Sequence, residues 1–164
     1  MGTTSKQVMD IKTSKGLSQT SNEELRAWTD KGWEQAMREG NYDRSREHLN
    51  FEVQKGGIVT PIDKKRPLTE RMAENLASRG IKDPNEGLAE PRFRTVVNFI
   101  FGGSTDRMRE LAFGNQVVGF ESKGGNEHVR RMPEIEEWAR DIYRFVADKY
   151  GEENIISFIV HCDE

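Results

Sequence analysis

The chain has 164 residues, of which 34% are hydrophobic and 32% charged, and its net charge at pH 7 is −3. This length suits one domain with a sizeable core. The negative net charge argues against a protein that coats polyanions non-specifically, but it allows a local basic groove. No apolar run approaches the roughly 20 residues of a membrane span, the N-terminus has no signal pattern, and the single cysteine, Cys162, excludes an internal disulfide. We therefore expect one domain, residues 1–164, in an intracellular, cytoplasmic protein.

The first half of the chain predicts a strand, a helix and a hairpin after a loose terminus at residues 1–4. Residues 6–12 partly alternate polar and apolar side chains, which indicates a short strand. An apolar spacing of three to four residues predicts a helix over residues 21–40, which opens with a capping box of Ser21 and Glu24. A Gly-Gly turn between two short apolar runs then predicts a hairpin within residues 50–62.

The second half predicts three helices and two buried strands. The expected helices cover residues 69–79, 105–113 and 133–150, and the expected strands cover residues 92–101 and 155–161. The helix over residues 133–150 has the most continuous apolar stripe and should lie on the sheet that contains the last strand. The pattern predicts a two-layer α/β or α+β domain, in which helices pack on a mostly antiparallel sheet.

Two polar segments carry clustered cations. Residues 41–50 lack a clear period and include four side chains suited to phosphate contacts, namely Arg44, Arg46, His48 and Asn50. The alternative for this segment is a solvated loop held by ion pairs to Asp43 and Glu47. Residues 114–131 are rich in glycine and basic side chains, which predicts a mobile loop.

The chain ends on three side chains that could hold a divalent metal or transfer protons. His161, Asp163 and Glu164 follow the last apolar strand, and a strand end is a rigid place from which to aim such groups. The alternative is a hydrogen-bonded or surface histidine followed by a solvated acidic terminus. Metal sites in proteins commonly use three or four ligands, so these residues alone do not decide between the two.

Two segments together resemble one known family. Residues 45–52 read Ser-Arg-Glu-His-Leu-Asn-Phe-Glu, and residues 150–164 run from Tyr-Gly-Glu-Glu-Asn-Ile to Val-His-Cys-Asp-Glu. Both resemble segments of the Mob/Pre plasmid mobilisation relaxases, also called plasmid recombination enzymes, in their MobV-type, Bacteroides-type versions. The order of the segments and the helix before the second one also agree, and the resemblance covers most of the chain from about residue 5.

The resemblance implies a fold and an activity. It implies an HUH-type relaxase fold, with an antiparallel sheet flanked by helices, and metal-dependent nicking of one strand of origin-of-transfer DNA through a covalent 5′-phosphoprotein. Mn²⁺ or Mg²⁺ is the implied metal, His161 matches its first ligand, and Glu164 matches the motif carboxylate. Arg26 matches an arginine near the family's nucleophile, and together with the cations of residues 41–50 it is expected to contact the DNA.

Two departures from the family pattern limit what is expected of this chain. It ends at Glu164, before a Pro-His-x-His half of the metal motif, so we expect an N-terminal part of a relaxase that binds metal weakly or not at all and is itself inactive. The segment Ser21–Arg26 also lacks the histidine of the family's His-Asn-x-Arg segment. Tyr42 is then a candidate nucleophile, because a phenolate can form a phosphotyrosine link.

Other readings of the sequence predict different behaviour. In a non-catalytic DNA-binding module, residues 41–50 and 123–131 would hold DNA in a salt-sensitive manner without metal. In a third reading, the motif matches are chance in a small α/β domain. If the family's missing histidines lie on a strand beside residues 155–161, this strand is left at an exposed apolar sheet edge, which predicts a homodimer or strand exchange.

Overall fold

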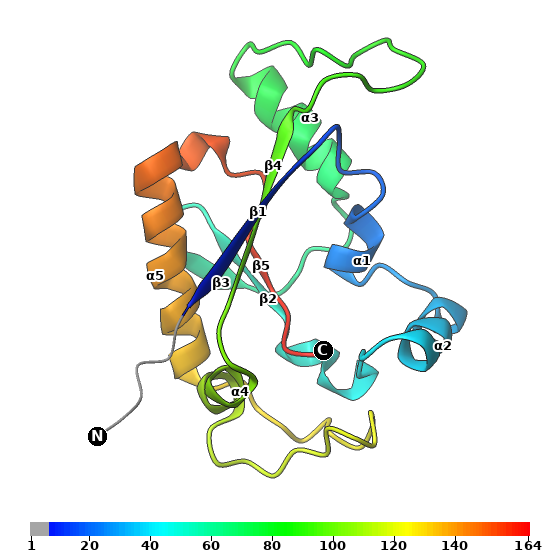
Figure 1. The fold of residues 1–164 in the computed structure, drawn as a ribbon, viewed down its shortest axis with the longest axis vertical. Coiled ribbons are helices and arrows are strands. Elements are labelled where there is room, and N and C mark those ends of the chain that lie inside the picture. The colour runs from blue at the N-terminus through cyan, green and yellow to red at the C-terminus, as the bar shows by residue number, and fades with distance from the viewer. Residues whose placement is uncertain (1–6) are drawn as a thin grey trace.

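Helices surround two small antiparallel sheets in the computed structural model, which describes residues 7–164 (Figure 1). In chain order the elements are β1 (Val8–Ser14), α1 (Ser21–Leu25), α2 (Asp30–Glu39), the 3-10 helix η1 (Arg44–Leu49), β2 (Phe51–Gln54), β3 (Ile58–Thr60), α3 (Leu68–Ser78), β4 (Val96–Gly102), α4 (Thr105–Phe113), α5 (Pro133–Tyr150), the 3-10 helix η2 (Glu152–Asn154) and β5 (Ile159–Val160). The expected α+β class is confirmed. The expected loose terminus at residues 1–4, and Lys6 of the expected first strand, lie outside the described residues.

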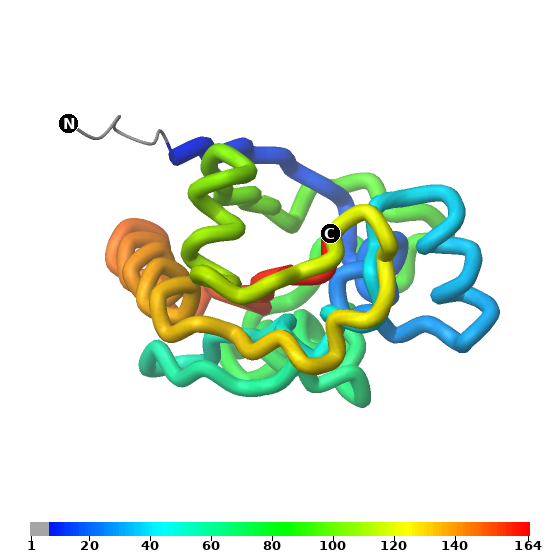
Figure 2. Tube along the Cα trace, turned by 90° about the horizontal axis from the view of Figure 1, so that it is seen from below, coloured from blue at the N-terminus to red at the C-terminus, as the bar shows by residue number. Residues whose placement is uncertain are grey.

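The strands form two sheets where the sequence predicted one. β1 and β4 make an antiparallel ribbon in which Ile11 lies opposite Phe99, and the second sheet has the order β3-β2-β5. Within the second sheet, β2 and β3 form the predicted hairpin, and Phe51 of β2 pairs with Val160 of β5. Figure 2 shows the β1–β4 ribbon on one side of β5 and the β2–β3 hairpin on the other. The last strand therefore runs through the middle of the fold.

Helix α5 covers the three-stranded sheet, as its apolar stripe predicted. Ile135, Ala139 and Tyr143 of α5 are buried in one cluster with Phe51 and Val160. The helix begins at Pro133 and ends at Tyr150, and Gly151 follows it with φ of +91°, a conformation that favours glycine. Burial of this stripe stabilises the fold by roughly 25 cal/mol for each Å² of apolar surface removed from water.

A break divides the predicted helix at residues 21–40. Arg26 has φ of +53° and ends α1, and α2 starts four residues later, at Asp30. The predicted capping box is wrong, because α1 begins after Thr20 with no side-chain cap and the Ser21 hydroxyl instead accepts a hydrogen bond from Leu68 N at 2.9 Å. The break makes it possible for Arg26 to turn into the interior, where its side chain is 0% exposed.

Two further segments differ from their predictions in secondary structure. Most of residues 41–50 form η1 rather than an irregular loop, and Asp43 caps η1 by accepting from Ser45 N at 3.0 Å. Of the predicted strand at residues 155–161, only Ile159–Val160 pair in a ladder. On one side of this short pairing Phe158 O still accepts from Val53 N at 3.0 Å, and on the other side residues 161–164 are held largely by side chains, as described below.

The remaining helices and the loop at residues 114–131 lie where the sequence predicted them. Helices α3 and α4 lie where they were predicted, and Ser104 caps α4 by accepting from Arg107 N at 3.2 Å. Residues 114–131 contain no regular element, as predicted, yet Lys123 Nζ donates to the carbonyl oxygens of Met37 and Gly40 at 2.9 and 2.7 Å. Among the helices of residues 7–164, none has the length and apolar character needed to cross a membrane.

Candidate functional site

The last residues of the chain are anchored by Arg26. Its Nε donates to Asp163 Oδ2 at 2.8 Å and its Nη2 to Asp163 Oδ1 at 2.9 Å, and both side chains are 0% exposed. The same Nη2 also donates to Glu164 Oε1 at 2.7 Å. A buried carboxylate is tolerated when it is paired and hydrogen-bonded, as this one is. The alternative of a solvated acidic terminus is therefore wrong for Asp163.

Asn50 links the segment after η1 to the same carboxylate. Its Nδ2 donates to Asp163 Oδ2 at 2.8 Å, and its Oδ1 accepts from Cys162 N at 2.6 Å. One amide side chain thus satisfies a buried carboxylate and a buried backbone N–H that has left the strand ladder. Both Asp163 oxygens are now occupied by hydrogen-bond donors from within the protein.

Asp43 and Arg46 hold the backbone of the same segment. Asp43 N donates to Asp163 O at 2.7 Å, and Arg46 Nη1 donates to Cys162 O at 2.8 Å. Arg46 Nε also donates to Asp43 Oδ2 at 2.8 Å, and the two side chains are 4% and 0% exposed. The expected ion pair to Asp43 exists, but it lies inside the protein and not on a solvated loop.

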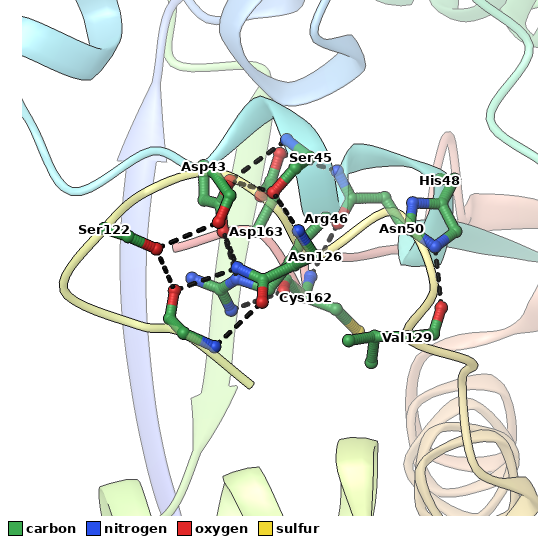
Figure 3. Close-up of polar contacts among 12 residues, drawn as sticks. Asp43, Ser45, Arg46, His48, Asn50, Ser122, Asn126, Val129, Cys162 and Asp163 are labelled. Carbon is green, nitrogen blue, oxygen red and sulfur yellow. Dashed lines mark hydrogen bonds and ion pairs between the residues drawn. The ribbon is translucent and has the colours of Figure 1, made fainter. Parts of the chain in front are cut away.

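The loop at residues 114–131 completes this network through Asn126 (Figure 3). Asn126 Nδ2 donates to Asp43 Oδ2 at 2.8 Å, and its backbone N donates to Ser45 Oγ at 3.1 Å. Burial raises the pKa of Asp43, but hydrogen bonds from Ser45, Arg46 and Asn126 outweigh this effect and lower it below its usual value. We call Arg26, Asp43, Arg46, Asn50, Asn126 and Asp163 the polar network.

His161 lies beside this network with its protonation state set by its surroundings. Its Nε2 lies 2.7 Å from Glu24 O, and because a carbonyl oxygen only accepts, Nε2 carries the proton. Burial and, after it, the positive charge of Arg26 lower the pKa of His161. The imidazole is therefore neutral at pH 7 and has its lone pair on Nδ1, the form in which histidine binds metals.

Tyr42 and Glu23 form a hydrogen-bonded pair at the edge of the network. The Tyr42 hydroxyl donates to Glu23 Oε1 at 2.7 Å, and the guanidinium carbon of Arg26 lies 4.6 Å from the centre of the phenol ring. Burial, followed by the hydrogen bond to Glu23, raises the pKa of Tyr42 to about 12. The phenol is thus protonated at neutral pH and needs a proton acceptor to act as a nucleophile.

The described residues do not by themselves form a complete metal site. Among residues 7–164, no group of three or more His, Cys, Asp or Glu side chains is placed to hold a metal ion. Asp163 is fully used by Arg26 and Asn50, which leaves the Nδ1 of His161 and the half-exposed carboxylate of Glu164. Two donors do not match the three or four protein ligands typical of bound metals, so these two groups do not hold a metal without further ligands.

The five residues predicted to contact DNA fall into two groups. Arg26, Arg46 and Asn50 are buried, and they donate to acceptors within the protein. Arg44 keeps 44% of its side chain exposed and pairs with Asp30 at 2.8 Å, so unlike Arg26 and Arg46 it is accessible to a polyanion. The fifth residue, His48, is also exposed, and its Nε2 lies 2.7 Å from Val129 O.

Sequence reasoning missed two members of the network and one neighbour. Asp43 was considered only as a partner in a surface ion pair, and neither Asn126 nor Glu23 was considered at all. Asn126 sits in a Gly-rich loop without periodicity, so no local pattern marks it as buried, yet it is only 1% exposed. The burial of a single polar residue in such a loop leaves no signal in the local sequence, because the partners that bury it are distant along the chain.

Comparisons with known proteins provide no relative from which to transfer a function. No protein-family model, curated protein or solved structure matches this chain. A function is therefore argued from the residues and contacts described above.

Proposed function

We propose that this chain belongs to a relaxase-type catalytic domain that nicks one strand of origin-of-transfer DNA. The observation that most supports the proposal is the direct contact between the two segments on which the family resemblance rests. Asn50, from the first segment, bonds to Cys162 and Asp163 of the second, at sequence separations of 112 and 113 residues. A chance match of two short motifs gives no reason for them to meet in one buried network.

The proposed nucleophile is Tyr42, with Glu23 as its base. The phenol oxygen would attack the scissile phosphorus as its proton passes to Glu23, to which it is already hydrogen-bonded. The new bond joins the tyrosine oxygen to the 5′ phosphate, and the bond from phosphorus to the 3′ oxygen breaks, leaving a 3′ hydroxyl once that oxygen takes a proton from solvent. Arg26, close to the ring, favours the developing phenolate charge.

His161 is the proposed metal-binding residue of the whole protein. Its neutral ring is oriented by the Glu24 carbonyl, an arrangement common for histidine ligands, and it points a lone pair away from that carbonyl. Ligands outside residues 7–164 would complete the site in this proposal. Mn²⁺ or Mg²⁺ bound there would polarise the scissile phosphate as a Lewis acid.

Plasmid nicking tests the proposal. Supercoiled plasmid carrying the cognate origin is incubated with Mn²⁺ and either this chain or a version extended by the sequence encoded after Glu164. We expect the extended protein to give nicked circles and a protein–DNA adduct that survives detergent, and we expect Tyr42→Phe and His161→Ala to abolish both. If the extended protein binds the origin and never nicks it, relaxase activity is ruled out.

A non-catalytic DNA-binding module is the second candidate. It is favoured by Arg44, a partly exposed cation that directly follows Asp43 of the buried polar network. This candidate predicts origin binding that weakens steeply with salt and does not change with Mn²⁺ or EDTA. Affinity measured by fluorescence anisotropy with and without EDTA separates the two candidates, because a relaxase site is expected to bind its origin more tightly with metal.

A further inference from the structure

The strand β1 is unusually open to solvent along its length. Six of its seven residues are exposed, whereas its partner β4 has only two exposed residues among seven. Among residues 7–164, β1 pairs with β4 alone, so the backbone groups along its other edge have no strand partner. An edge of this length is a template on which another strand can add.

The ribbon also lacks the number of strands that usually makes a sheet stable. An isolated two-stranded ribbon is marginal in water, and three or more strands with an apolar face are normally needed. Met9 and Ile11 lie on one face of β1 together with Phe99 of β4, and they remain 43% and 49% exposed. A further strand beside β1 would therefore bury apolar surface and satisfy backbone groups at once.

We propose that β1 pairs with β1 of a second copy, antiparallel, about a twofold axis at Ile11. In this register Asp10 of each copy lies directly opposite Lys12 of the other, and Ile11 lies opposite its own counterpart. The result is a four-stranded sheet in the order β4-β1-β1-β4. The interface is isologous, because the same edge contributes from both copies.

Charge selects this register over its neighbours. A twofold axis at Asp10 would place the Asp10 carboxylates of the two copies opposite each other. A twofold axis at Lys12 would place the Lys12 ammonium groups of the two copies opposite each other. Like charges directly opposite destabilise a pair of strands, and opposite charges stabilise it. Of the three axes, only the one at Ile11 forms two attractive pairs.

One side-chain contact reaches the β1 backbone from the segment that leads into β4, and it leaves room for a partner strand. Arg94 Nη1 donates to Thr13 O at 2.9 Å, and a carbonyl oxygen has a second lone pair for a partner strand. The edge of β5, where the sequence predicted dimerisation, is less suited, since β5 pairs through two residues and Val160 is only 8% exposed. The observations therefore favour β1 as the self-association edge.

Sedimentation velocity over a range of protein concentrations tests this interface with a pair of charge variants. Asp10→Lys places two lysines on each strand, and Lys12→Asp places two aspartates on each strand. Each variant alone brings like charges together across the axis, so we expect its dimer to dissociate at least tenfold more readily. Mixed in equal amounts, the two variants regain opposite charges at every position and should form a heterodimer at about the wild-type concentration.

The controls make the result specific to β1. The double variant Asp10→Lys with Lys12→Asp reverses both charges and should self-associate like the wild type. Glu137→Lys, at an exposed position of α5, changes the net charge as Asp10→Lys does and should leave association unchanged. Circular dichroism checks that each variant is folded. A wild-type chain that stays monomeric at several hundred micromolar, or a dimer that both single variants leave intact, overturns the proposal.

Discussion

Arg26 and Asp163 form a two-bond ion pair across 137 residues of sequence, and neither side chain is exposed to solvent. The pair explains two departures of the structure from its local sequence pattern. Arg26 takes up a left-handed backbone conformation that interrupts a helix, at a cost of roughly 1 kcal/mol or more for a residue other than glycine. Residues 161–164 leave their strand ladder and are held by the side chains of Arg26, Arg46 and Asn50 and by the backbone N–H of Asp43.

Replacing Asp163 by Asn should strongly destabilise the fold. The Arg26 guanidinium would then be buried next to a neutral amide, and breaking a buried pair in this way costs about 3 kcal/mol or more. Urea unfolding followed by circular dichroism measures the change in the free energy of unfolding. Asp141→Asn, which removes an exposed pair with Arg144, is the matched control and should change it by less than about 0.5 kcal/mol. A similar small change for Asp163→Asn would contradict the anchoring role.

Asn126 should hold the loop at residues 114–131 in place. Asn126→Ala removes two hydrogen bonds with Gly119 and one to Asp43, which predicts a loss of about 2 kcal/mol. Hydrogen exchange should accelerate in this loop more than in α5. Asn115→Ala, at an exposed position of the same loop, is expected to leave both the stability and the exchange unchanged. Equal effects from the two variants would show that the loop is not held by Asn126.

Stability should fall as the pH is lowered from 7 to 5, partly because of His161. Its pKa in the folded protein lies below the ordinary value of 6.5, so the unfolded chain binds the proton more readily. The contribution of neutral His161 to the free energy of unfolding is therefore complete above about pH 6.5. It is lost as the pH falls through the pKa of His161 in the folded protein, at up to about 1.4 kcal/mol per pH unit. His161→Gln should flatten this slope in urea titrations at a series of pH values. A slope that does not change would contradict the prediction.

Cys162 should be inert in the folded protein. Burial raises the pKa of its thiol to about 12, so almost no thiolate is present at pH 8, and the side chain is only 6% exposed. We expect a disulfide reagent such as DTNB to react at least about a thousandfold faster in 8 M urea than in buffer. Fast labelling in buffer would mean that residues 161–164 detach readily from the polar network.

Arg44 should matter for DNA binding in either proposed function. Arg44→Gln removes an accessible cation, so origin affinity should weaken and the slope of log affinity against log salt should decrease by about one. Arg144→Gln, an exposed arginine of α5, is the matched control and is expected to have no effect. Equal losses from both variants would mean that binding is a general charge effect.

Much of the fold follows from local patterns in the sequence. The helix α5 matches its predicted limits because proline, a regular apolar stripe and a terminal glycine are all signals carried within a few residues of each other. The hairpin of β2 and β3 and the capped helix α4 were found for the same reason. The two motif segments were also visible in the sequence, as was their joint resemblance to one family.

Only the tertiary structure decided what the polar residues of those segments do. Arg26, Arg46 and Asn50 were expected to face DNA, but they are buried against Asp43, Cys162 and Asp163. A hydrophobic period reports which face of a local element is buried, whereas a buried charge is stable only beside partners that lie anywhere in the chain. The sequence by itself therefore determined the helices and the hairpin, and long-range hydrogen bonding decided where a helix breaks, how short the last strand is and which arginines remain at the surface.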